Sequence, residues 1–357
     1  MAQKKVSERR VRKKPNPATD DWLSLILTVP PSEQMVQYSY TVELYDLMPK
    51  YAWSGQTSKD GRLPNIKRTF EHLNSCFEVT ITPARIESEE GISEDRHPGK
   101  TEELIEDILR KFVAEGRGIA KGGRLGVKFT LYEVAQELKR VGHARSIEEI
   151  KTALRIMAAC SIRLIGRRAD GSKIDMTNPL LGPLYLATRE DWAAVGKAEQ
   201  CYVEFHPLVE SGAAKGQIRL VSYETCMRYR SVLAKYIHKR MSHNFKQART
   251  EFAYTMGVTK LVLEAGMTPR QYPTNTLSQL VAKALDEMIA CGVVARYASE
   301  PRIDPTTGKT LDVLVSIYPT QTFVEDVKAA NFWQQAVRER INQRQLDEVS
   351  PEELVAP

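Results

Sequence analysis

The chain lacks the sequence features of several common protein classes. Its five cysteines are odd in number and widely spaced, with no Cys-x-x-Cys pair that could bind zinc or form a redox couple. Its longest apolar stretch, around Trp22–Val29, is too short to cross a bilayer, and no signal-peptide core follows the basic N-terminus. These absences predict a soluble protein of the reducing cytoplasm.

Catalytic and nucleotide-binding motifs are also missing. Two Gly-Lys-Thr triplets lack the earlier glycine that a phosphate-binding loop requires, because Glu94 and Ile303 stand at that position. His238 and His243 are too far apart in sequence to share a helix face as an i, i+4 metal pair would. The sequence has no His-x-His pair and no Gly-x-Ser-x-Gly elbow. It therefore predicts a protein that is not an enzyme and needs no cofactor and no metal.

Net charge is absent from most of the chain. The formal charge is +6, and residues 1–14 alone hold seven Lys or Arg and one Glu. Removing these from the totals of 51 basic and 45 acidic residues leaves equal numbers of each sign. Any nucleic acid must therefore bind the folded part through local patches. Residues 1–20, which are basic and interrupted by Pro15 and Pro17, predict a disordered arm.

What the sequence does contain is a repeated order of elements. The first copy begins with a predicted helix, Glu102–Glu115, and a short strand, Val127–Phe129. Two helices follow, opened by the capping boxes Thr130-x-x-Glu133 and Ser146-x-x-Glu149. An alternating segment, Ser161–Arg168, then starts a predicted hairpin.

The same order returns about 125 residues later. It comprises a helix at Met227–Phe245, a strand at Phe252–Met256, a helix at Val258–Glu264 and a strongly amphipathic helix at Thr274–Cys291. A hairpin with its tip at Asp304–Thr310 closes the unit. Three helices and a two-stranded wing, present twice, predict an α+β fold of tandem winged-helix type with a disordered basic N-terminal arm.

The predicted organisation has five parts. They are the basic arm (1–20), a mixed N-terminal region and loop (21–100), module one (101–215), module two (216–325), and a C-terminal helix and tail (326–357). Within the mixed region, Phe77–Ile81 alternates like a strand, and residues 87–100 have the composition of a loop.

The helix at Thr274–Cys291 is the predicted DNA-recognition helix. The major groove, about 12 Å wide, admits one helix, whose exposed N-terminal residues can reach base edges. Near its start this helix has hydrogen-bonding groups and no acid, while Asp286 and Glu287 come only later. A solvated helix face is the alternative, which the repeated architecture disfavours. The predicted contacts in this part of module two are Thr274, Asn275, Ser278, Gln279 and Lys283, with Arg270 before the helix and Arg302 and Lys309 on the wing.

Other basic residues are predicted to contact phosphates. Arg228, Lys235 and Lys239 fall on one stripe of the acid-free helix Met227–Phe245, although such a stripe can also be a solvated face. The corresponding recognition helix of module one begins with Glu148 and Glu149, which would face phosphates unfavourably. Its basic groups come later, at Lys151, Arg155, Arg163, Arg167 and Arg168. We therefore expect module one to contact the DNA backbone or a partner subunit, and module two to recognise sequence.

Several segments resemble theta-type plasmid replication initiators, most closely the TrfA-like branch. They are VKFTLYEVAQEL, SIEEIKTALRIMAAC, YRSVLAKYIHKRMSH and LSQLVAKALDEMIACGVV, within residues 100–320. The resemblance implies a tandem winged-helix protein that binds repeated double-stranded origin sites (iterons) and opens an adjacent AT-rich segment. It also implies recruitment of the host initiator and the replicative helicase, and monomer–dimer self-association through module one.

A shorter segment, Thr41–Tyr45, resembles the pentapeptides by which replication proteins bind the sliding clamp. Leu44 and Tyr45 would be the apolar anchors, and Thr41 replaces the usual leading glutamine. An ordinary strand is the favoured alternative.

Two other functions remain open. A plasmid- or phage-borne winged-helix transcriptional repressor could use the same modules, although two non-identical modules and a long N-terminal region favour an initiator. A DNA-nicking enzyme is the third hypothesis, which the missing catalytic motifs disfavour.

Deleting residues 1–20 should flatten the dependence of DNA affinity on salt. The arm carries the net charge but no pattern that forms structure, so it should add sequence-independent affinity through counterion release. Binding isotherms at several salt concentrations measure this slope. A truncated protein that instead lost its preference for the cognate site would show that the arm contacts bases.

Overall fold

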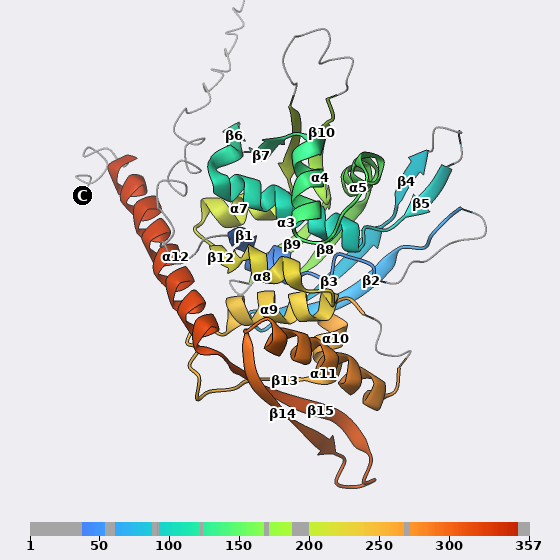
Figure 1. Ribbon diagram of the computed structural model, residues 1–357, viewed down its shortest axis with the longest axis vertical. Helices are drawn as coiled ribbons and strands as arrows, with labels where there is room; N and C mark the ends of the chain where they lie inside the picture. Colours follow the sequence, from blue (N-terminus) through green and yellow to red (C-terminus); the bar gives the residue numbers. More distant parts are fainter. Residues whose placement is uncertain are drawn as a thin grey trace, which may run out of the picture.

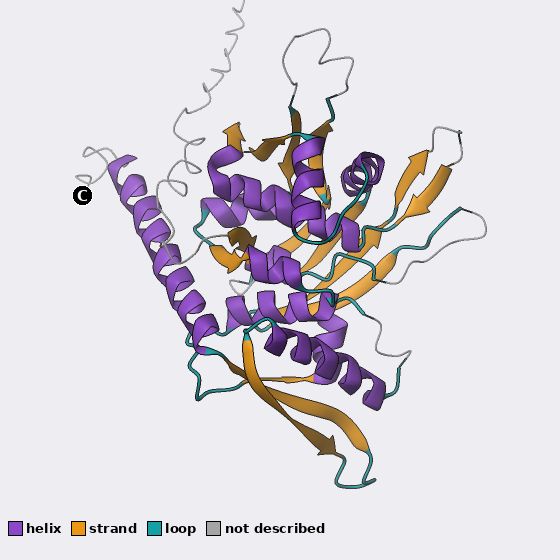
Figure 2. Cartoon of the chain, viewed as in Figure 1, coloured by secondary structure: helices purple, strands orange, loops and turns teal. Residues whose placement is uncertain are grey.

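The computed structural model describes residues 38–53, 61–87, 91, 93–121, 124–167, 171–187, 200–267 and 272–348. Helices and small antiparallel sheets alternate along these ranges, which confirms the predicted α+β class (Figure 1, Figure 2). The basic arm, residues 1–20, lies outside the described residues. In the described ranges, no helix is both long and apolar enough to span a membrane.

The mixed N-terminal region forms strands and one short helix. Its elements are β1 (Tyr38–Val42), α2 (Glu43–Leu47), β2 (Ile66–His72), β3 (Ser75–Thr82), β4 (Ala84–Glu87) and β5 (Ser93–Arg96). The predicted strand Phe77–Ile81 lies inside β3. The loop predicted at residues 87–100 is wrong in part, because Ser93–Arg96 pairs with β4 as a hairpin.

Module one contains the predicted order of helix, strand, two helices and hairpin. Both capping boxes are confirmed: the side chains of Thr130 and Ser146 accept from the backbone N–H groups of Glu133 and Glu149. The elements are α3 (Lys100–Phe112), a π-helical turn (Val113–Arg117), β6 (Gly118–Lys121), β7 (Arg124–Phe129), α4 (Leu131–Arg140), α5 (Ile147–Ala159), β8 (Ser161–Arg167), β9 (Lys173–Pro179), β10 (Leu181–Tyr185), β11 (Cys201–Phe205) and α7 (Pro207–Ala214).

Module two also has its predicted order, with one correction. The helix expected at Met227–Phe245 is two helices, because the backbone is extended at Tyr229 and Ser231 caps the second helix through the N–H of Ala234. The elements are β12 (Ile218–Ser222), α8 (Tyr223–Arg228), α9 (Val232–Asn244), β13 (Tyr254–Gly257), α10 (Val258–Glu264), α11 (Thr274–Ala290), β14 (Val294–Ile303) and β15 (Thr310–Pro319), followed by α12 (Gln321–Glu348).

The N-terminal region joins both modules. Its β2–β3 hairpin extends the β8–β9 hairpin of module one into a four-stranded sheet, and β1 pairs with β12. Gly166 of β8 lies opposite Phe77, whose ring leaves no room for a Cβ at that glycine. The same hairpin reaches module two, where Glu264 of α10 accepts from the N–H of Glu71 at 3.2 Å.

The structure has two hydrophobic cores, and α12 contacts both. Phe323 and Val327 of α12 belong to the core of module two, whereas Trp333 belongs to the core shared by module one and the N-terminal region. There the Trp333 ring stacks on Tyr40, with centroids 5.5 Å apart. The change from one core to the other falls near Tyr229, after the boundary predicted at residue 216. Figure 1 shows α12 along one side of the molecule.

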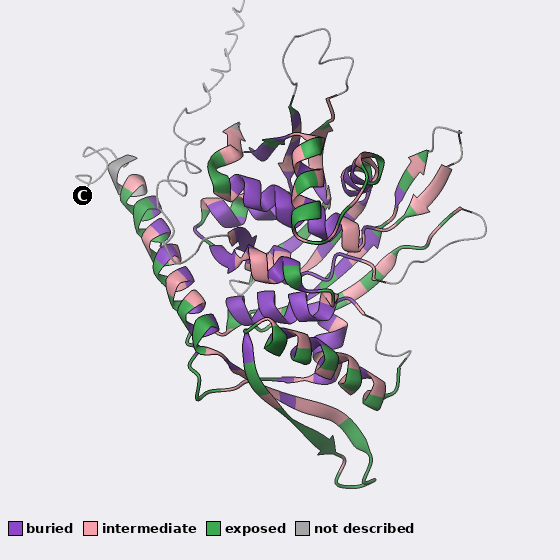
Figure 3. Ribbon diagram, in the orientation of Figure 1, coloured by how far each residue is buried: buried purple, intermediate pink, exposed green. Residues whose placement is uncertain are grey.

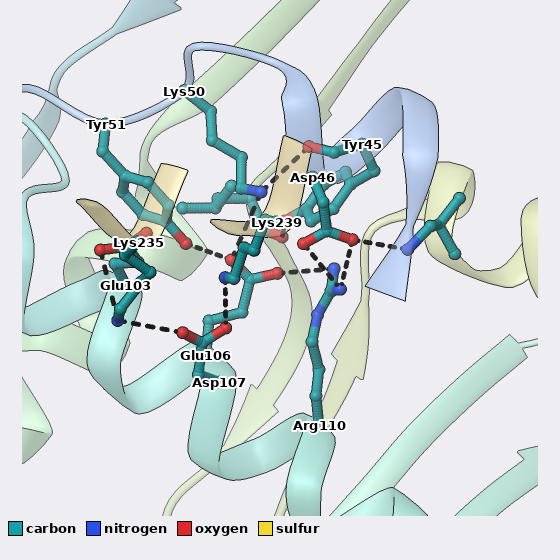
Figure 4. Close-up of polar contacts among 12 residues, drawn as sticks. Tyr45, Asp46, Lys50, Tyr51, Glu103, Glu106, Asp107, Arg110, Lys235 and Lys239 are labelled. Carbon is teal, nitrogen blue, oxygen red and sulfur yellow. Dashed lines mark hydrogen bonds and ion pairs between the residues drawn. The ribbon is translucent and has the colours of Figure 1, made fainter. Parts of the chain in front are cut away.

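Buried ion pairs connect module one to module two (Figure 4). Asp107 of α3 accepts from the ammonium groups of Lys235 at 3.1 Å and Lys239 at 2.7 Å, both on α9. Burial alone would raise the pKa of Asp107, but the two ammonium groups outweigh it and hold the pKa of that carboxyl below its usual range. The prediction that Lys235 and Lys239 contact phosphates is therefore wrong: they are only 2% and 6% exposed, and their charge is used inside the protein.

Helix α3 also binds the N-terminal region, through a second set of charged side chains. Arg110 of α3 pairs with Asp46 at 2.7 Å and with Glu106 at 3.0 Å. Glu106 also lies 3.8 Å from the ammonium group of Lys50 and accepts from the Tyr51 hydroxyl. One helix, α3, thus carries ionic contacts to both of its neighbours.

The clamp-peptide prediction is not supported by this arrangement. Thr41 and Tyr45 are completely buried, and the Tyr45 hydroxyl donates to the carbonyl of Leu180 at 3.3 Å. Leu44 is half-buried beside them. The segment is a strand end and the start of a short helix, so its aromatic anchor is not available to a partner.

Replacing Asp107 with Asn should lower the free energy of unfolding by about 3–5 kcal/mol, because it leaves buried ammonium groups without their carboxylate. Urea denaturation measures this. Because the pKa of Asp107 is lowered in the fold, its contribution should be present above an unfolded pKa of about 3.9 and be lost as the pH falls. Arg163→Gln, which breaks an exposed pair with Asp175, is the control and should change the midpoint little. An equal loss in both variants would contradict the assignment.

Candidate nucleic-acid interface

Helix α11 exposes a polar stripe because its opposite face is buried. Its core residues are Leu277, Val281, Ala284, Leu285 and Met288, and they pack with side chains of α9 and α10. Asn275, Gln279 and Lys283 are spaced by four residues and are all exposed, as predicted for a recognition face (Figure 3).

Other predicted residues of this helix are less accessible. Thr274 and Ser278 are half-buried, and the Ser278 hydroxyl donates to the carbonyl of Thr274 at 3.0 Å. That hydroxyl proton is therefore already used within the helix, which leaves only its oxygen as an acceptor. Arg270 lies outside the described residues.

The two acids at the end of α11 hold neighbouring elements. Glu287 accepts from the backbone N–H groups of Arg230 at 2.6 Å and Ser231 at 3.0 Å, at the start of α9. Asp286 accepts from the Tyr297 hydroxyl of β14 at 3.0 Å. Sequence reasoning placed these acids beyond the groove but missed that they fix α11 against α9 and the wing.

The wing tip has a defined conformation that leaves two cations in solvent. The Asp304 carboxylate accepts from the N–H of Thr306 at 2.8 Å and from the Thr307 hydroxyl at 2.6 Å. The turn closes through Gly308, whose positive φ of 65° favours glycine. Arg302 and Lys309 are exposed on either side of this turn, and the hairpin extends away from the body (Figure 3).

The base of the wing is tied to α10. Asp312 of β15 accepts from the N–H and hydroxyl of Thr259 at 3.1 and 2.8 Å. A Cβ at Gly257 would lie 2.5 Å from the Asp312 carboxylate, so this contact requires a glycine there. Near the base, the Arg296 guanidinium lies 3.5 Å from the centroid of the Tyr318 ring, a cation that sequence reasoning did not single out. These contacts thus hold α11 and the β14–β15 hairpin in one relative position.

In module one, only some of the predicted cations are available. Lys151 pairs with Glu148 at 2.7 Å, and Arg163 pairs with Asp175 at 2.8 Å. Arg155 and Arg167 are exposed, whereas Arg168 lies outside the described residues.

Arg155 lines an open depression of about 940 Å³ between α5, β4 and β10. Arg85, on a strand that sequence reasoning had not recognised, lines the same depression. In module two, Arg228 at the end of α8 is exposed, unlike Lys235 and Lys239. Among the described cations predicted to contact phosphates, Arg155, Arg167 and Arg228 are therefore exposed and outside any ion pair in the described residues.

Comparison with known proteins gives distant matches only. No family model and no curated protein sequence matches the chain. Domains 2 and 3 of RctB align with a TM-score of 0.44 and 9% identity, covering 75% of this chain and 94% of that chain. The Pi initiator protein in complex with iteron DNA aligns with a TM-score of 0.38 and 11% identity, covering 55% of this chain and 81% of that chain. Similarities this low do not by themselves establish a shared fold or function.

Replacing Asn275 or Gln279 with Ala should cost about 1–3 kcal/mol on a cognate duplex and much less on a scrambled one, because these amides suit bidentate contacts to adenine. Lys309→Ala should weaken both duplexes similarly, since a lysine at a wing tip contacts phosphate. Competition binding measures both effects.

Glu149→Ala is the matched control in module one. Its carboxylate accepts from the N–H of Ser146 at 2.7 Å, so the change affects a helix cap and should leave base discrimination intact. Equal losses on both duplexes for Gln279→Ala would remove α11 from the recognition role.

Proposed function

We propose that the chain is a sequence-specific double-stranded-DNA-binding protein with two winged-helix modules, and that it acts as a plasmid replication initiator rather than an enzyme. The observation that carries DNA binding is the stripe on α11: Asn275, Gln279 and Lys283 are exposed and spaced by four residues. Amide side chains suit adenine, and an ammonium group suits guanine or phosphate. The wing, with Lys309 at its tip, would add backbone contacts beside the same groove.

The buried contact between α3 of module one and α9 of module two favours an initiator over a repressor. Module one offers Arg155 and Arg167 but an acidic helix start, so the two modules are not equivalent. The buried pairs between α3 and α9 keep these unequal modules in one arrangement. Such a unit suits an asymmetric site and hence direct repeats, whereas a two-fold repressor dimer suits a palindrome.

The finer parts of the proposal come from the sequence resemblance. They are membership of the TrfA-like branch, opening of adjacent AT-rich DNA, recruitment of the host initiator and replicative helicase, and monomer–dimer exchange through module one.

Two measurements test the proposal together. Footprinting on the DNA that flanks the gene should show an array of direct repeats, and the protein supplied in trans should maintain a plasmid carrying that array. A single protected palindrome without plasmid maintenance would favour the repressor. Cleavage of the DNA in the presence of Mg²⁺ would contradict a non-enzymatic role.

A further inference from the structure

The guanidinium of Arg219, on β12, is buried without an acidic partner. Its side chain donates to the amide oxygen of Asn331 at 2.7 Å and to the carbonyl of Val327 at 3.2 Å, and both acceptors are neutral. Within the described ranges, no carboxylate lies within ion-pair distance of it, and its Nε has no hydrogen-bond partner. Arg219 is only 1% exposed, and the carboxylate that favours its charge, Glu43, makes no direct ion pair with it.

Arg110 provides the comparison inside the same protein. It is equally buried, but Asp46 and Glu106 neutralise it. Burial lowers the pKa of Arg219 to about 10, whereas the two carboxylates outweigh burial and raise the pKa of Arg110 above its usual range. A buried cation normally has such a partner.

Arg219 lines a cavity that gathers further cationic groups. The cavity measures about 400 Å³ and lies between β12, the β2–β3 turn, the end of α9 and α12. Lys215, Lys246 and Arg338 line it, against one acid, Glu43, which already has Lys246 at 3.8 Å and His72 at 3.5 Å. The Arg338 guanidinium donates to the carbonyl of Gly216 at 3.0 Å and pairs with no carboxylate in the described part of the chain.

His243 adds an unused hydrogen-bonding atom to the same cavity. It is 2% exposed, and its Nε2 has no hydrogen-bond partner within the described part of the chain. A buried ring nitrogen without a partner is costly unless a group absent from the protein satisfies it. Two buried nitrogens without a hydrogen-bond partner in the described residues, Nε of Arg219 and Nε2 of His243, therefore belong to side chains that line the same cavity as three further cations.

We propose that this cavity binds a phosphate group of a small molecule, either inorganic phosphate or a small phosphate ester, between Arg219, His243, Lys215 and Arg338. A phosphate has enough acceptor oxygens for both buried nitrogens and the two cations at the mouth. Its charge would add to that of Glu43, which makes no direct ion pair with Arg219. Leu44 and Leu73 on the cavity wall would contact any apolar part of an ester.

The position of the cavity argues for a small molecule rather than origin DNA. In Figure 1, α12 lies along one side of the molecule, and α11 begins on the other. The cavity shares no lining residue with α11, the wing or α5. Binding here therefore belongs to a site separate from the proposed DNA interface.

The test is titration of the full chain with inorganic phosphate and, separately, with glycerol 3-phosphate, at constant ionic strength. Calorimetry should give saturable binding at one site per chain for at least one of these probes, and the preferred probe identifies the source of the phosphate. The double variant Lys215→Gln/Arg338→Gln should weaken binding by about tenfold or more, since each lost contact is a charge-assisted hydrogen bond. Both residues are exposed, so this variant should remain folded, whereas substitution of Arg219 could unfold the chain.

Lys328→Gln is the matched control, because Lys328 is an exposed cation of α12 that does not line this cavity. It should bind the anion as the parent does. In protein labelled with ¹³C at histidine, the His243 signal should shift on titration. Absence of saturation, equal weakening by Lys328→Gln, or an unmoved His243 signal would overturn the proposal.

DNA binding separates this proposal from the proposed function. Lys215→Gln/Arg338→Gln should bind the cognate duplex as the parent does. Loss of duplex binding in this variant would show that the cavity is part of the nucleic-acid interface and would overturn the small-molecule assignment. Loss of phosphate binding with duplex binding intact is the result the proposal requires.

Discussion

The carboxylate of Asp107 is the contact on which the arrangement of the two modules depends. It lies on the first helix of module one and holds Lys235 and Lys239 on the first long helix of module two. A buried ion pair contributes little more to stability than apolar packing would, but a displaced pair leaves unpaired charges in the interior. The network therefore favours one relative orientation over its alternatives. Because α9 also packs on α11, this orientation sets the position of α11 relative to module one.

The same contact decides which charges remain for DNA. Outside its basic N-terminus the chain has no net charge, and the joint between the modules removes two more cations from the surface. Of the predicted contacts, the polar stripe on α11, Arg228, the two cations on the wing, and Arg155 and Arg167 in module one are exposed. Under the proposed function, these cations would contact phosphates, and the amides of the α11 stripe would contact base edges.

Local patterns in the sequence predicted the helices and the wing, whereas the sequence did not predict the contacts between distant segments. The capping boxes at Thr130 and Ser146 and the apolar face of α11 each need only neighbouring residues. The strands of the N-terminal region pair with β8 and β12, far along the chain, so their short alternating patterns give little indication of a partner. Lys235 and Lys239 were predicted to be exposed because their partner, Asp107, is also far away in the sequence. A signal did exist, because Glu103 and Asp107 form an acidic stripe with the same four-residue spacing on α3.

Buried charges in this protein lie where segments meet, and this explains why the N-terminal region is part of the folded body. Asp46 neutralises Arg110 in module one, while Glu71 pairs with Lys260 of module two beside Glu264. Removing the region would therefore take away one of the two carboxylates that pair with Arg110 and one of the two that lie beside Lys260. An isolated module two would likewise expose Lys235 and Lys239 without Asp107. Two ammonium groups that are buried in the intact chain would then be available to phosphates or other anions.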